Sequence, residues 1–131
     1  MVREGSSHQD PFADQGPVLV FVYGTLLRGQ RNHSYLLGSV FMGAARTEPS
    51  YTLVSLGAFP ALRETGVTAV PGELYSVEPS ILADLDRLEG HPGFYRRGTV
   101  QLEDGRVAST YFLPPDQHIN AESIPRWPPL P

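Results

Sequence analysis

Short apolar runs, separated by turns rich in glycine and proline, recur along this chain. The run from Val18 to Val22 contains only apolar residues, mostly β-branched, which is typical of a strand buried on both faces. It leads directly into the turn Tyr23-Gly24-Thr25-Leu26. Alternating patterns predict further strands over residues 51–56, 70–77, 95–102 and 106–113. The proline and glycine within 70–77 indicate an edge strand or a bulge.

Two segments have the spacing of helices. Residues 79–89 begin with proline at the first helical position, repeat apolar residues at helical intervals and end before Gly90. Residues 32–37 form a shorter predicted helix, with Asn32 as its cap. Residues 59–62 are predicted as a short extended or turn segment, and 95–102 with 106–113 as a hairpin. The fold class is therefore α+β: a small mixed sheet that curls like a barrel, with two short helices.

The chain divides into an extension and one domain. Residues 1–16 are polar and turn-rich, which predicts a disordered N-terminal extension. Residues 17–131 form a single predicted domain, long enough to bury a core. From about residue 114 the chain is rich in proline, so we expect an extended tail that Trp127 pins onto the domain.

Composition removes several classes of function. A formal net charge of −4 disfavours nucleic acids and anionic membranes as partners. All 10 basic residues are arginine, which excludes Schiff-base lysine chemistry, and the absence of cysteine excludes thiol catalysis. No apolar stretch approaches the roughly 20 residues of a membrane helix, and no segment resembles a signal peptide. We therefore expect a cytoplasmic protein.

The turn after the first strand has the character of an anion site. Gly24 allows a sharp change of direction and lets another group approach the backbone closely. Turns of this kind leave N–H groups pointing outward, which suits a carboxylate or a phosphate. Thr25 is expected to stabilise the turn through its hydroxyl rather than to act as a nucleophile.

One carboxylate of helix 79–89 lies on the wrong face. At about 100° per residue, Glu89 projects on the same side as the apolar residues Ile81, Leu82, Leu85 and Leu88. Burial and the C-terminal end of the helix dipole both raise the pKa of such a carboxyl, as a general base requires. Alternatively, Glu89 lies past the last turn, faces solvent or pairs with Arg96 or Arg97. Asp84 and Asp86 fall on the exposed face.

These features together resemble a known family. The quoted segments are Val20-Phe21-Val22-Tyr23-Gly24-Thr25-Leu26-Leu27-Arg28-Gly29, Leu85-Asp86-Arg87-Leu88-Glu89-Gly90-His91-Pro92 and Tyr95-Arg96-Arg97. In this order and spacing they resemble the γ-glutamylcyclotransferase-like family, and most of all its small γ-glutamylamine cyclotransferase, or AIG2-like, branch. The likeness spans roughly residues 18–113, and residues 59–62 and 72–75 also look like family segments. It implies a mixed α/β fold with a small barrel-like sheet and a cavity.

The resemblance also implies site residues and a reaction. The substrate's α-carboxylate would bind the backbone amides of Gly24, Thr25 and Leu26, and Glu89 would be the acid/base residue. Tyr23 would line the pocket, and Tyr95 would place a hydroxyl near the reacting group. A small γ-glutamyl substrate would cyclise to 5-oxoproline and release its amine, with no metal and no organic cofactor. Holding the substrate folded supplies much of the advantage of such a ring closure.

Two other functions stay open at this point. The first is a non-catalytic module that keeps the carboxylate pocket and binds a small amino-acid-like anion. The second is an interaction protein that uses the proline-rich tail. His91 is expected to be a turn residue and Arg28 a solvated surface arginine. The sequence carries no signature of the leaving amine or of the oligomeric state.

Overall fold

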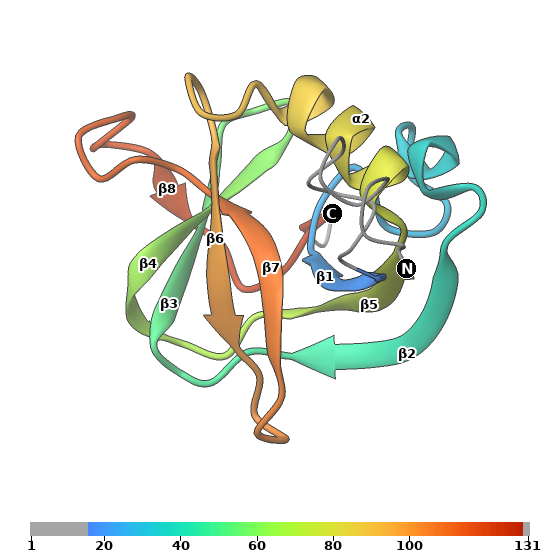
Figure 1. Cartoon of the computed structure of the whole chain (residues 1–131). Coiled ribbons are helices and arrows are strands. Elements are labelled where there is room, and N and C mark those ends of the chain that lie inside the picture. Colours follow the sequence, from blue (N-terminus) through green and yellow to red (C-terminus); the bar gives the residue numbers. More distant parts are fainter. Residues whose placement is uncertain (1–15, 130–131) are drawn as a thin grey trace, which may run out of the picture.

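The computed structural model describes residues 16–129, which form one curved mixed sheet with an α-helix and a 3₁₀ helix (Figure 1). The predicted extension, residues 1–16, lies outside the described part apart from Gly16. The strands are β1 (Val18–Val22), β2 (Val40–Arg46), β3 (Tyr51–Ser55), β4 (Pro60–Thr68), β5 (Pro71–Val77), β6 (Arg96–Gln101), β7 (Val107–Phe112) and β8 (Glu122–Ser123). The helices are η1 (His33–Leu36), of the 3₁₀ type, and α2 (Pro79–Glu89).

The sheet is strongly curved but its strand ladder stays open. Its order is β2-β5-β1-β7-β4-β3-β8, and β6 pairs with the other side of β7. A single isolated bridge between Thr47 and Leu102 brings the end of β2 near the β6–β7 hairpin. The expected mixed sheet with few helices is therefore present, but among the described residues no continuous ladder closes it into a barrel.

Strand β7 changes its neighbour part-way along its length. Val20 of β1 pairs in parallel with Ser109, whereas Leu62 of β4 pairs in parallel with Phe112. Strands β1 and β4 therefore pair with the same side of β7, one after the other along its length, and they diverge between Ser109 and Phe112. The glycine turn leaves the sheet at this divergence, because it follows directly after Val22.

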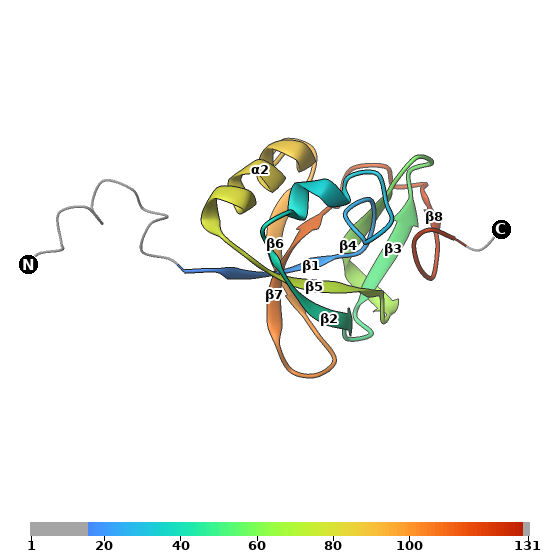
Figure 2. The same cartoon turned by 90° about the vertical axis from the view of Figure 1, so that its right-hand side faces the viewer.

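Two clusters of buried side chains stabilise the sheet from opposite sides. Val20 and Val22 pack in one cluster with Leu82 and Leu85 of α2, whereas Phe21 packs in the other. Strand β1 thus contributes to both clusters, as its uninterrupted apolar run predicts. Helix α2 lies beside η1 along one side of the sheet (Figure 2). Burial of the Leu82 and Leu85 side chains stabilises the fold by about 2 kcal/mol each.

Several local predictions are wrong for physical reasons. Strand β5 is not at an edge, since β1 and β2 both pair with it, and its proline and glycine are confined to its first two positions. In the pairing of β5 with β2, the bulge lies in β2, between Phe41 and Gly43. Strand β4 has nine residues and begins at Pro60, so the segment 59–62, expected to be short and either extended or a turn, is the start of a longer strand. Asn32 makes no side-chain cap of η1, because its amide bonds elsewhere.

The C-terminal segment returns to the sheet. Strand β8 pairs with β3, and the amide of Ile124 donates to the carbonyl of Leu53 at 2.8 Å. Trp127 is half-buried against the cluster that contains Phe21. The tail therefore packs on the domain as far as the described residues extend.

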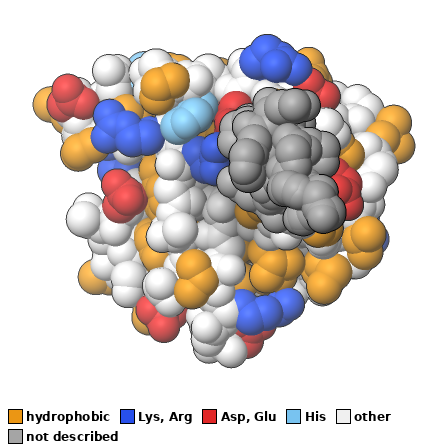
Figure 3. All heavy atoms as spheres, viewed as in Figure 1, with side chains coloured by type: hydrophobic (Ala, Val, Ile, Leu, Met, Phe, Trp, Pro, Cys, Tyr) orange, Lys and Arg blue, Asp and Glu red, His pale blue; other side chains and the backbone are white. Residues whose placement is uncertain are grey.

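Charged side chains on the surface are interspersed. On the described part of the face in Figure 3, basic and acidic groups alternate and form no large area of one sign. Arg46 pairs with Glu103, Arg106 with Asp104, and Arg87 with Asp84, all at exposed positions. Ion pairs at such exposed positions contribute little to stability, so the two apolar clusters account for most of it. No helix within residues 16–129 has the length and apolar character needed to cross a membrane.

Candidate active site

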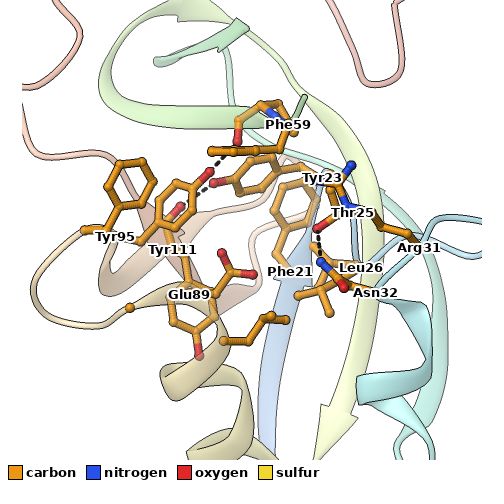
Figure 4. A pocket seen from close by; sticks show the side chains of 16 residues that line it. Phe21, Tyr23, Thr25, Leu26, Arg31, Asn32, Phe59, Glu89, Tyr95 and Tyr111 are labelled. Atoms are coloured by element: carbon orange, nitrogen blue, oxygen red, sulfur yellow. Dashed lines mark hydrogen bonds between the residues drawn. The ribbon is translucent and has the colours of Figure 1, made fainter. Parts of the chain in front are cut away.

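A cavity of about 290 Å³ opens between the end of β1 and the end of α2 (Figure 4). All six residues predicted from the sequence line it: Tyr23, Gly24, Thr25, Leu26, Glu89 and Tyr95. The divergence of β1 from β4 makes room for it, and the aromatic residues Phe59 and Phe94 line it as well. The structure thus brings together two sequence segments that are far apart in the chain.

The turn after β1 forms a glycine cup, defined here as the backbone amides of Gly24, Thr25 and Leu26. The carbonyl oxygens of Gly24 and Thr25 accept hydrogen bonds from the amides of Leu27 and Asn32, at 3.1 and 2.9 Å. The three cup amides donate to no acceptor within residues 16–129. Unpaired donors in a partly buried turn suit an anion.

Glycine is required at the first cup position because the turn lies against strand β4. A Cβ atom on Gly24 would lie 2.6 Å from Cγ of Pro60. Any larger residue would push the two segments apart. Thr25, in contrast, accepts a hydrogen bond from the Asn32 side-chain amide at 3.0 Å, so its hydroxyl proton is left to point elsewhere.

Glu89 is the last residue of α2 and its carboxylate points into the cavity (Figure 4). Helix α2 ends there because Gly90 adopts a left-handed conformation, with φ of 69°, and its amide turns back to the carbonyl of Arg87. Burial raises the pKa of the Glu89 carboxyl from 4.5 to about 7. No cation within residues 16–129 pairs with it, and Arg97, one of the alternative partners, bonds to Asp86.

Two buried tyrosines connect the strands around the cavity. The Tyr23 hydroxyl donates to the carbonyl of Tyr111 at 2.6 Å and accepts from the amide of Leu62 at 3.2 Å. The Tyr95 hydroxyl donates to the carbonyl of Pro60 at 2.5 Å. Burial raises the pKa of both phenols, so both remain neutral. The Tyr23 hydroxyl therefore links β7 and β4 at the point where β1 ends. The oxygen of Tyr95 can still accept a hydrogen bond from a ligand, because its own proton bonds to Pro60.

The family can now be assigned. A family model described as gamma-glutamyl cyclotransferase, AIG2-like, matches residues 20–127. The chain belongs to this family. A Vibrio cholerae serotype O1 protein named "Putative gamma-glutamylcyclotransferase" is 49% identical over 87 residues, which cover 66% of this chain and 75% of that protein. Gamma-glutamylaminecyclotransferase B of Danio rerio is 42% identical over 94 residues, covering 65% of this chain and 49% of that protein.

Solved structures agree with this assignment. The crystal structure of an AIG2-like protein from Mus musculus superposes with a TM-score of 0.69 at 28% identity, covering 86% of this chain and 99% of that one. The chain is thus an enzyme of the γ-glutamyl cyclotransferase type. The mixed sheet with few helices is the fold that it shares with these AIG2-like proteins.

Asp86, a carboxylate that the helical pattern misplaces, bonds to Tyr111, one of the residues that line the cavity. Asp86 was expected on the exposed face of α2, but it accepts hydrogen bonds from the Tyr111 hydroxyl at 2.6 Å and from Arg97 Nε at 2.9 Å. A second bond from Arg97 Nη2, at 3.2 Å, occupies its other oxygen. Asp86 lies one helical turn before Glu89, a spacing that could have signalled the shared side. The network ties α2 to β6 and β7 directly behind the cavity.

Other predicted surface residues lie as expected. Asp84 is exposed and pairs with Arg87. The ring Nδ1 of His91 accepts from the amide of Arg97 at 3.0 Å, which makes it a turn residue. Arg28 is exposed, lies beside Glu73 and covers the Phe41 ring. Residues 16–129 contain no cluster of three or more His, Cys, Asp or Glu side chains suited to a metal.

Two aromatic residues and an arginine of the cavity lining carry no signal in the sequence pattern. Phe59 and Phe94 meet edge to face, with ring centroids 6.1 Å apart, and Phe94 contacts Tyr95 in the same manner at 4.8 Å. Arg31 also lines the cavity, and its Nη1 donates to the carbonyl of Ala58 at 3.1 Å. These residues come from loops, where sequence periodicity carries no signal.

Proposed function

We propose that this cyclotransferase converts a γ-glutamyl donor into 5-oxoproline and a free amine, with Glu89 as the general acid and base. The observation that carries the proposal is the meeting of an unpaired anion cup and an unpaired, buried carboxylate in one cavity. The names of the family and of its relatives support the reaction class.

The cup fixes the substrate. The α-carboxylate of the glutamyl group would accept hydrogen bonds from the amides of Gly24, Thr25 and Leu26. This places the α-ammonium within reach of Glu89 and folds the glutamyl chain so that its γ-carbonyl approaches the nitrogen. Orientation of this kind can supply several kcal/mol of the barrier to an intramolecular attack.

Glu89 then relays protons from the α-nitrogen to the departing nitrogen. Its carboxylate takes a proton from the α-ammonium, and the neutral amine attacks the γ-carbonyl carbon to form the five-membered ring. The Glu89 carboxyl next donates this proton to the departing nitrogen, whose bond to the γ-carbon breaks. The ring nitrogen still holds one extra proton, which it gives to the Glu89 carboxylate, and Glu89 passes that proton to the released amine. The products are 5-oxoproline and the amine in its ammonium form, and the enzyme returns to its starting state.

The raised pKa makes the first proton transfer feasible. The α-carboxylate of a γ-glutamyl donor is free, so its α-ammonium is a weaker acid than a peptide N-terminus, and transfer of its proton to an ordinary glutamate is costly. Raising the pKa of the Glu89 carboxyl from 4.5 to about 7 lowers this cost by about 3 kcal/mol. Burial of Glu89 thus brings the base closer to the substrate in proton affinity, as efficient acid–base catalysis requires.

The test is turnover of γ-glutamyl donors. The purified chain is incubated with γ-glutamyl amino acids and γ-glutamyl amines, and 5-oxoproline is quantified by mass spectrometry against a no-enzyme control. We expect Glu89→Gln to lower kcat by about 10³-fold while still binding 5-oxoproline in calorimetry. Glu48→Gln, an exposed carboxylate far from the cavity lining, serves as the matched control with full activity.

Two results would overturn the proposal. Full activity of Glu89→Gln on the best donor would remove the assigned base. Binding of 5-oxoproline by the unmodified chain without turnover of any donor would identify a binding module that keeps the pocket and lacks the reaction.

A further inference from the structure

The cavity lining carries one negative and one positive side chain, and the two differ in their exposure to solvent. Of the residues that line it, only Arg31 and Glu89 are charged. The Glu89 carboxyl is largely buried, whereas Arg31 is exposed. Figure 4 shows Arg31 beside Thr25 and Phe59, across the cavity from Tyr95. The single fixed charge at the mouth is therefore positive.

Arg31 is held in this position by a loop on the other side of the mouth. Its Nη1 donates to the carbonyl of Ala58, the residue before Phe59. This bond uses one of the five N–H donors of the guanidinium, and no carboxylate within residues 16–129 pairs with Arg31. The group is thus anchored and retains donors for an anion.

The positions of the cup, Glu89 and Arg31 determine how a γ-glutamyl donor would be oriented in the cavity. The glutamyl end must reach the cup and Glu89, because the reaction takes place there. The departing amine then extends toward the mouth, past the aromatic rings of Phe59 and Phe94 and toward Arg31. An apolar body suits the rings, and a carboxylate suits a guanidinium, which binds it with two parallel hydrogen bonds.

We propose that Arg31 selects γ-glutamyl donors whose leaving amine carries a carboxylate, that is, γ-glutamyl amino acids, over donors of uncharged or cationic amines. This inference rests on the reaction proposed above. It assigns Arg31 to the leaving-group end of the substrate and makes it a determinant of specificity. A polyamine, in contrast, would bring a second positive charge to a mouth where no described acidic side chain except buried Glu89 lines the cavity.

The test compares two donors that differ only in the carboxylate: γ-glutamylleucine and γ-glutamylisopentylamine. We expect the unmodified enzyme to prefer γ-glutamylleucine about tenfold in kcat/KM, the ratio typical of a charge-assisted hydrogen bond. In Arg31→Gln the ratio falls to about one, whereas Arg31→Lys keeps the charge but loses the two parallel hydrogen bonds, so it retains only part of the preference. Because Arg31 is exposed, the preference should also weaken between about 50 and about 500 mM salt.

The matched control is Arg28→Gln. Arg28 is an exposed arginine of the same loop that does not line the cavity, so its loss changes net charge equally. A ratio near one in the unmodified enzyme would overturn the inference. So would an equal loss on both donors in Arg31→Gln, which would show that Arg31 holds the glutamyl carboxylate common to both.

A binding measurement separates this inference from the reaction. Calorimetry of both donors is repeated on Glu89→Gln, alone and combined with Arg31→Gln. If the unmodified enzyme forms no 5-oxoproline from either donor, but γ-glutamylleucine binds Glu89→Gln more tightly in an Arg31-dependent way, the reaction assignment fails and the subsite stands. Equal affinities for the two donors would reject the subsite whether or not turnover occurs.

Discussion

Replacement of Glu89 by glutamine should inactivate the enzyme and, above neutral pH, stabilise it. The folded protein raises the pKa of the Glu89 carboxyl from 4.5 to about 7 because the group is buried. Between these pH values the folded state holds a proton that the unfolded state has lost. The protonated carboxyl therefore contributes stability that is fully present below about pH 4.5 and is lost as the pH rises through about 7.

The magnitude follows from the two pKa values. Their difference of about 2.5 corresponds to about 3 kcal/mol of unfolding free energy that the ionised carboxylate costs at high pH. Glutamine has nearly the same shape and carries no charge, so Glu89→Gln escapes this cost. We expect the two proteins to match near pH 4.5 and to differ by about 3 kcal/mol near pH 8.5, with glutamine the more stable.

The assay is urea denaturation of both proteins across this pH range, followed by fluorescence of Trp127 and by circular dichroism. Glu48→Gln, at an exposed position, should track the unmodified protein at every pH. Parallel stability profiles for Glu89→Gln and the unmodified protein would show that Glu89 has an ordinary pKa. They would refute the burial argument for the base even if the variant were inactive.

Three further predictions concern the reaction and the hydrogen-bond network beside the cavity. The kcat/KM of the enzyme should fall as the pH drops through about 7, where Glu89 becomes protonated, and a pH–rate profile with an apparent pKa near 4.5 would contradict this. Thr25→Ala loses the bond from Asn32 and should lower kcat/KM about tenfold. Gly24→Ala should lower kcat/KM more, because its Cβ atom meets Pro60. If steady-state kinetics showed a larger loss for Thr25→Ala than for Gly24→Ala, a cup made of backbone amides would be excluded. Asp86→Asn should destabilise the fold by about 1–3 kcal/mol, since it weakens the bonds from Tyr111 and Arg97, and an unchanged denaturation midpoint would count against this network.

The periodicity of the sequence predicts the glycine turn and Glu89, because the turn directly follows a strand and Glu89 lies at the end of a helix. The apolar run of β1 predicts a central strand, and its abrupt end at Gly24 predicts the turn. The helical spacing of 79–89 places Glu89 on the side of Leu85, and the structure has α2 over the same residues. Each of these inferences uses only local sequence and a fixed repeat.

Pairing between distant segments could not be inferred in this way. Strand β2 presents Val40, Phe41 and Met42 to solvent, so no alternation marks it as a strand. Asp86 appears exposed on a helical wheel, yet Tyr111 and Arg97 arrive from β7 and β6 to bond with it. The open sheet likewise depends on which strands β7 accepts as neighbours, a property of no single segment.

The pairing of β7 with both β1 and β4 also determines when the cavity can form during synthesis of the protein. The ribosome synthesises β1, the glycine turn, β4 and α2 before β7. Strands β1 and β4 do not pair with each other, and each pairs with β7. At the usual speed of translation, the cup therefore waits on the order of ten seconds for the strand that completes its surroundings. A nascent chain halted within that interval carries both the cup and Glu89 but lacks the carbonyl of Tyr111, to which the Tyr23 hydroxyl bonds beside the cavity.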